Sequence, residues 1–216
     1  AYDEVFSAVH VADHHPFQAW VYYMYPNNHV FFNLLNSLLF FWIPDPLWGG
    51  KAISILAYVA LGVVWFRLWL SLSGKQSILS LVATLPLLLQ LPVWGFASQG
   101  RGYELYLLCE VLMLVYYGRF IWEGNPKDLK RLPWIIGLGY ACLPTFLFLH
   151  AAICGLEFFR QIYFKRFRWP FWNAQLWAMG LVLLFYIPLF QFSGLAALSD
   201  NPFVRSSDGA SWAVFQ

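Results

Sequence analysis

The sequence predicts an all-α integral membrane protein, and both its composition and the lengths of its apolar runs carry that prediction. Of the 216 residues, 60% are hydrophobic and only 11% are charged, whereas soluble domains carry about 25% charged residues. Several apolar runs reach the roughly 20 residues that a helix needs to cross a bilayer. Trp and Tyr gather near the ends of these runs, as expected for rings at the level of the lipid headgroups. The net charge of +2, without a basic stripe, gives no indication of nucleic acid binding.

The N-terminal part of the chain does not predict a membrane span. Residues 1–28 are mixed and polar, and we expect them to form an external loop. The apolar run that follows ends at Pro44 after about 14 residues, which is too short to cross the bilayer comfortably. Residues 29–43 are therefore expected to form an interfacial or re-entrant helix.

Three spans are predicted next, over residues 52–72, 77–97 and 103–122. Pro86 and Pro92 fall inside the second span and are expected to kink it, because neighbouring helices can satisfy the backbone groups that a proline frees. A tight turn over residues 98–102 joins the second span to the third.

Basic residues decide the topology of the next segment. A single helix over 133–164 would place the basic segments 127–131 and 160–168 on opposite sides. Basic loops, however, share the cytoplasmic side of a membrane protein. We therefore expect a hairpin of two short helices that turns near Pro144.

Residues 170–193 then form a last span, and residues 194–216 an external loop. With the basic segments in the cytoplasm, the polar loop 1–28 and the turn 98–102 face the non-cytoplasmic side. Because both ends of the chain lie in polar stretches, we expect residues 1–216 to be one membrane domain from a longer chain.

Asp3 and Glu4 form a pair of carboxylates in the polar segment that precedes the first apolar run. Acidic residues are scarce in this chain, so we interpret the pair as candidates for catalysis at a membrane surface. A general base must lie within hydrogen-bond reach of the hydroxyl that it deprotonates. The alternative interpretation is a solvated acidic loop.

Arg101 is a single arginine in the turn on the non-cytoplasmic side. Its guanidinium group suits a phosphate or pyrophosphate, because it donates to two oxygens at once; ordinary snorkelling at a helix end is the alternative. Glu104 opens the following helix, where a carboxylate favours the positive end of the helix dipole, so its role is either structural or functional.

The histidine-rich N-terminal segment permits a metal site as an alternative, formed from His10, Asp13, His14, His15 and His29. Imidazole suits zinc, copper or iron. His10 and His14 have HxxxH spacing, but no HExxH motif occurs, and the adjacent His14 and His15 would point apart on a helix, so a dedicated histidine metal site is not favoured. His29 lies where the polar loop meets the apolar run, and it could hydrogen-bond a sugar or a phosphate, whereas Asn28 could cap the helix.

Two segments of the chain resemble a known family. Tyr2-Asp3-Glu4-Val5-Phe6-Ser7, with His10 and the run from Pro26 through Asn28 and His29 to Leu35, resembles the first external loop of GT-C glycosyltransferases. The branch is the bacterial group related to protein O-mannosyltransferases and to the aminoarabinose transferase of lipid A (glycosyltransferase family 39). The segment from Ser98 to Tyr103 resembles the ARGY-type turn of that group, with Gly100 where alanine is usual.

The resemblance implies a GT-C-like bundle that transfers a sugar from a polyprenyl-phosphate donor to an acceptor hydroxyl, in a bacterial plasma membrane with the site facing the periplasm. Asp3 matches the acidic residue that activates the acceptor hydroxyl in the family, with Glu4 beside it. The positions that it places near the donor phosphate are Arg101, His29, Asn28 and Tyr103, with His10 and Glu104 as further candidates. It leaves open whether a divalent metal ion takes part, and whether the acceptor is a lipid, a glycan or a protein.

A transporter or flippase of lipid-linked precursors is the alternative function, and a histidine metal enzyme is a third. A transporter requires polar residues along a path through the bilayer. In this chain, we expect the polar residues to concentrate at one face of the bundle, with Glu110 and Glu157 as the acidic candidates for a path.

Overall fold

The computed structural model describes residues 15–21, 29–124 and 126–194, which form helices and turns and contain no strand. Among these residues, three helices are long and apolar enough to cross a membrane: α4 (Pro46–Leu72), α7 (Tyr103–Trp122) and α10 (Trp169–Ser193). A bent pair, α5 (Ser77–Leu88) with α6 (Leu91–Ser98), would make a fourth span. The chain is therefore an α-helical membrane protein.

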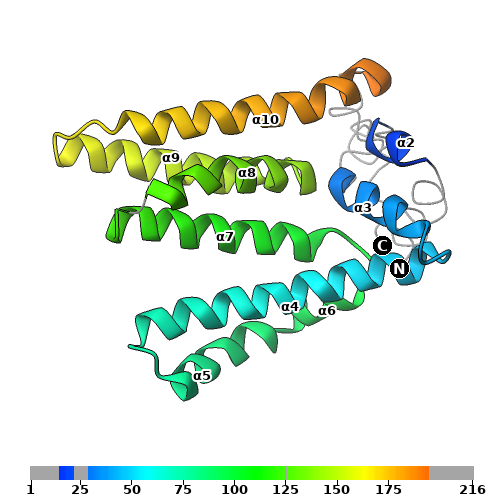
Figure 1. The fold of residues 1–216 in the computed structure, drawn as a ribbon, viewed down its shortest axis with the longest axis horizontal. Coiled ribbons are helices and arrows are strands. Elements are labelled where there is room, and N and C mark those ends of the chain that lie inside the picture. The colour runs from blue at the N-terminus through cyan, green and yellow to red at the C-terminus, as the bar shows by residue number, and fades with distance from the viewer. Residues whose placement is uncertain (1–14, 22–28, 125, 195–216) are drawn as a thin grey trace, which may run out of the picture.

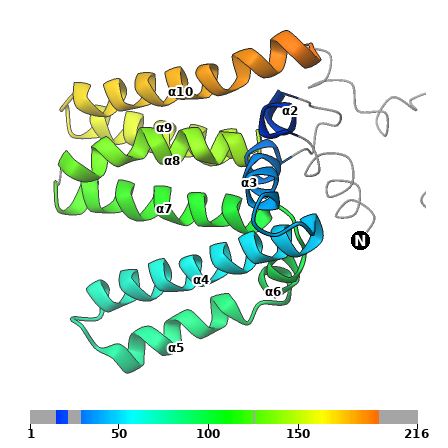
Figure 2. The same cartoon turned by 45° about the vertical axis from the view of Figure 1, so that its right-hand side comes forward.

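The long helices lie side by side in a bundle, from α10 through α8 and α7 to α4 and α5 (Figure 1). The hairpin helices are α8 (Pro126–Cys142) and α9 (Phe146–Tyr163). A short helix, α2 (Pro16–Val21), interrupts the segment that we expected to be a loop. The helix α3 (Val30–Phe40) lies at one end of the bundle, steeply inclined to the long helices (Figure 2). Its 11 residues are too few to cross a bilayer, as the short apolar run predicted.

The start of α4 is set by a local cap. The Asp45 carboxylate accepts hydrogen bonds from the backbone N–H groups of Leu47 and Trp48, at 2.9 and 3.3 Å. Pro46 occupies the first helical position, where its missing N–H costs nothing. The helix therefore begins six residues before the span predicted from 52. The sequence signal was present, because Asp-Pro is a typical helix start.

The predicted second span is divided in two. Helices α5 and α6 meet at an angle of 70°, across the break at Leu89 and Gln90. Pro86 lies inside α5, whereas Pro92 lies in the first turn of α6. Two kinks were expected, one at each proline; the structure instead has one sharp bend, which lies between Pro86 and Pro92.

The hairpin of α8 and α9 turns at residues 143–145, around Pro144 as the charge argument predicted. Gly139 makes the close return possible, since a Cβ atom there would lie 2.5 Å from the ring of the buried Phe146. One detail of the prediction is wrong: residues 127–131 belong to the first turns of α8 and are not a loop. Pro126 begins that helix, and Asp128 favours the positive end of its dipole.

Two apolar clusters hold the helices together. The larger one joins α7, α8, α9 and α10, with Leu132, Ile136, Phe146 and Phe171 almost fully buried. The smaller one joins α4, α6 and α7 through Leu61, Val93 and Val111. Many large apolar side chains instead point outward, as expected for a surface in contact with lipid tails.

The basic segments share one end of the bundle. In both views, the α4–α5, α7–α8 and α9–α10 turns lie at the end opposite α3 (Figures 1 and 2). These turns and the adjoining helix ends carry Lys75, Arg119, Lys127, Lys130, Arg131, Arg160, Lys165, Arg166 and Arg168. We call it the basic end; the turn that contains Arg101 lies at the α3 end.

Candidate functional site

The α6–α7 turn is anchored on α4. The Ser54 hydroxyl donates a hydrogen bond of 2.9 Å to the carbonyl of Arg101, and the Arg101 N–H donates to the Gln99 carbonyl at 2.7 Å. The turn packs directly on Gly50 of α4, where a Cβ would be in van der Waals contact with the Cα of Gly100 at 3.4 Å. The backbone that carries Arg101 is therefore held against a long helix.

Three predicted site residues meet at this turn. The guanidinium carbon of Arg101 lies 4.7 Å from the ring centre of Tyr103, a cation–π contact. The other neighbours of this ring are His29, edge-on at 4.5 Å, and Phe96, tilted at 4.7 Å. We call Arg101, Tyr103 and His29 the arginine cluster. It joins the start of α3 to the start of α7, two segments far apart in the sequence.

Gly102 is required for this arrangement. A Cβ atom at this position would lie 2.8 Å from the Cβ of His29 and 2.9 Å from its Nδ1. These distances are shorter than van der Waals contact, and the atoms that would have to shift belong to the buried His29. A residue with a side chain at position 102 would therefore push His29 away from Tyr103.

His29 is neutral in the folded protein at neutral pH. The residue is only 5% exposed. Burial and the nearby charge of Arg101 together lower its pKa to about 4, while the backbone of Cys142 acts weakly in the opposite direction. Neither ring nitrogen makes a hydrogen bond of ordinary geometry to the described residues. His29 is thus a neutral polar group beside a cation, suited to a hydrogen bond with a bound ligand.

The buried His29 predicts acid sensitivity. The unfolded chain takes up a proton near pH 6.5, the ordinary value, whereas the folded protein does so only near pH 4. The free energy of unfolding should therefore fall as the pH is lowered between these values, by on the order of 3 kcal/mol in total. Unfolding in detergent at several pH values tests this for wild type and His29→Gln. Below pH 6.5, the free energy of unfolding of the variant should depend less steeply on pH than that of wild type; above pH 7 the two dependences should be equal. The same dependence on pH in both proteins at every pH would contradict the prediction.

Glu104 comes directly after Tyr103, in the first turn of α7. It is fully buried, and neither carboxylate oxygen has a hydrogen-bond partner among the described residues. Tyr58 of α4 lies close enough to interact with its charge. A carboxyl group buried in a membrane bundle without a partner is costly, which makes it a candidate for function by default.

The other predicted site residues, Asp3, Glu4, His10 and Asn28, lie outside the described residues, as do residues 195–216 of the predicted loop 194–216. Within the described ranges, no group of three or more His, Cys, Asp or Glu residues is arranged to hold a metal ion. The prediction missed Ser54, Phe96 and Gly102. Only Gly102 had a signal, since two glycines flank Arg101.

Polar side chains also occur deeper in the bundle. The buried His150 joins three helices: its Nδ1 lies 3.1 Å from the Tyr140 hydroxyl, and its Nε2 lies 2.9 Å from Oε1 of Gln175. Glu157, also fully buried, accepts hydrogen bonds from Tyr117 and Arg160 near the basic end. The expectation that polar groups concentrate at one face is therefore wrong for the described helices.

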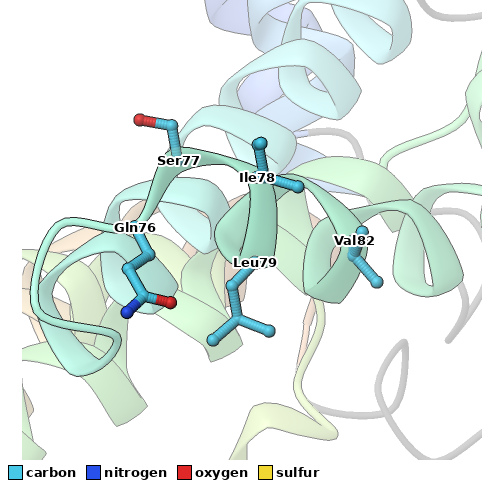
Figure 3. A pocket seen from close by; sticks show the side chains of 5 residues that line it. All are labelled: Gln76, Ser77, Ile78, Leu79 and Val82. Carbon is cyan, nitrogen blue, oxygen red and sulfur yellow. The ribbon is translucent and has the colours of Figure 1, made fainter.

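A hollow of about 570 Å³ at the start of α5 is not a comparable site. Its lining residues are Gln76, Ser77, Ile78, Leu79 and Val82. All five are exposed, and Figure 3 shows their side chains spreading to different sides of the helix. None of them can carry a charge at neutral pH. The arginine cluster remains the stronger candidate.

Fold and site together define a helical membrane protein with a cationic and aromatic cluster at one end of its bundle. Comparison of the chain with protein-family models, curated proteins and solved structures finds no match.

Proposed function

We propose that this protein transfers a sugar from a polyprenyl-phosphate donor to the hydroxyl group of a lipid, glycan or protein on the non-cytoplasmic side of the membrane. The observation that carries the proposal is the arginine cluster. Arg101 is held by Tyr103 and Ser54 next to the neutral His29, at the end of the bundle opposite the basic segments.

The location of the cluster suits a lipid-linked donor. The headgroup of such a donor sits at the membrane surface while its chain lies among apolar helices. Arg101 is in the turn just before α7, close to the start of the short helix α3. Because basic segments mark the cytoplasmic side, the cluster would face the opposite side, the periplasm in a bacterial plasma membrane.

The chemistry needs a base and a group that stabilises the leaving phosphate. In the proposed reaction, Asp3, with Glu4 beside it, takes the proton of the acceptor hydroxyl. The acceptor oxygen forms a bond to the anomeric carbon, and the bond from that carbon to the phosphate oxygen breaks with inversion. The departing polyprenyl phosphate keeps the electron pair, and Arg101 stabilises its charge. Neutral His29 would donate a hydrogen bond to the phosphate or to the sugar.

The test of the proposal is sugar transfer by the protein in its native membranes. Labelled polyprenyl-phosphate sugars are supplied, and loss of label from the lipid is followed. Asp3→Asn should reduce this loss to background while expression and thermal unfolding stay as in wild type. The matched variant Asp13→Asn, in the same segment, should retain transfer. Turnover like that of wild type in Asp3→Asn would remove this residue from the mechanism.

Transport of lipid-linked precursors is the second candidate, and the buried polar groups favour it. Glu104 at the start of α7, His150 in α9 and Glu157 towards the end of α9 are spaced along the bundle. The decisive measurement is movement of the labelled lipid between the leaflets of proteoliposomes. Movement without loss of the sugar, abolished by Glu104→Gln, would favour transport over transfer.

A further inference from the structure

A second cationic site lies at the basic end, far from the arginine cluster. A cavity of about 340 Å³ opens at the turn between α9 and α10. Its lining consists of Arg160, Gln161, Phe164, Arg166 and Arg168. Three of these five side chains are arginines, and none is acidic.

The backbone of the turn is fixed by hydrogen bonds. The Arg166 N–H donates to the carbonyl of Gln161, and the Lys165 N–H donates to that of Ile162, at 3.0 and 3.1 Å. This pair of bonds is the Schellman motif that ends many helices. Lys165 takes the left-handed position of the motif, with φ at 49°. Arg166 therefore projects from a turn whose backbone is hydrogen-bonded.

Gln161 fixes the other side of the cavity. It is 5% exposed. Its Oε1 accepts hydrogen bonds from the Arg168 backbone and from Nε1 of Trp172, both at 3.1 Å, and its Nε2 donates to Glu157 at 2.7 Å. The guanidinium of Arg168 also lies 5.4 Å from the ring centre of Phe120. Both sides of the cavity are thus ordered before any ligand binds.

The charges of the cavity do not cancel. Glu157 forms two hydrogen bonds of 2.7 Å with Arg160, so this pair is neutral as a unit. Within the described part of the chain, no carboxylate lies within ion-pair distance of Arg166 or Arg168. Two positive charges therefore face the cavity, a composition suited to a phosphate group.

We propose that this cavity binds the phosphate of an anionic phospholipid at the basic end of the bundle. The surrounding side chains argue for a lipid as the source of the phosphate. Tyr163, Phe167 and Trp169 are 80%, 58% and 66% exposed around the turn. Exposed aromatic rings of this kind mark the level of the lipid headgroups, and basic pockets at this level bind acidic lipids.

Lipid binding to the purified protein tests the proposal. Phosphatidylglycerol and phosphatidylcholine are titrated separately, and bound lipids are counted by native mass spectrometry. We expect wild type to prefer phosphatidylglycerol. The double variant Arg166→Gln/Arg168→Gln should weaken phosphatidylglycerol binding about 25-fold, because each arginine near an anionic surface contributes about fivefold. The control Arg67→Gln/Lys75→Gln removes two charges from the same end and should change little.

Calorimetry with inorganic pyrophosphate separates a lipid from a free phosphate compound. Binding of pyrophosphate that depends on Arg166 and Arg168 would assign the site to a soluble phosphate, whereas binding of the lipid alone supports the lipid. If the double variant unfolds, Arg166→Glu replaces it, since this side chain is exposed. Unchanged binding of both ligands in the variants would overturn the proposal.

Discussion

Arg101→Gln is expected to lower sugar transfer by about two to three orders of magnitude, the usual effect of removing one group that stabilises developing charge. Glutamine cannot neutralise the leaving phosphate. The carbonyl of residue 101 still accepts the hydrogen bond from Ser54, so the turn should keep its place. Initial rates of label loss from a polyprenyl-phosphate sugar, measured in membranes, provide the readout.

Two further variants make the Arg101 result specific. Arg101→Lys keeps the charge but loses the planar donor pair, and it should retain part of the activity. Arg67→Gln, the same substitution at an exposed position near the basic end of α4, should have no effect. Transfer by Arg101→Gln at the wild-type rate would exclude the arginine cluster as the donor site.

Arg160→Gln is expected to destabilise the bundle by about 3 kcal/mol, because it leaves a buried carboxylate without its cation. Glu157 is fully buried and receives two hydrogen bonds of 2.7 Å from Arg160. The hydrogen bonds from Tyr117 and Gln161 remain in the variant but cannot balance the charge. Reversible unfolding in mixed micelles measures the loss.

A double variant shows whether Arg160 stabilises the bundle through its charge or through its packing. Glu157→Gln/Arg160→Gln removes both charges and should recover most of the lost free energy of unfolding, since neutral amides can still hydrogen-bond. Arg166→Gln, an exposed position a few residues further on, should change it by less than about 0.5 kcal/mol. If Arg160→Gln and the double variant were equally unstable, the arginine would act through packing and not through its charge.

Features that depend only on residues close together in the sequence could be predicted from the sequence. The range of α7 and the short α3 follow from the lengths of apolar runs. The hairpin at Pro144 follows from the rule that basic segments share one side of the membrane. The start of α4 at Pro46 was predictable in the same way, from Asp45 and the proline, but apolar length alone placed it too late.

The candidate site could be predicted only in part. The sequence indicated Arg101, His29 and Tyr103 separately, through their residue types and the family resemblance. It contained no information on the distances among them, because α3 and the start of α7 are about 70 residues apart. The tertiary structure places His29 against Tyr103 and makes it neutral by burial, with Gly102 leaving the necessary space.

The sequence by itself determined that this is an α-helical membrane protein whose basic segments share one end, because apolar run length and charge are properties of local segments. Only the tertiary structure decided which polar groups are paired and which are not. Glu157 has Arg160, whereas Glu104 has no hydrogen-bond partner among the described residues. Both are glutamates in apolar helices, and the difference between them lies in the side chains that folding brings to their carboxylates.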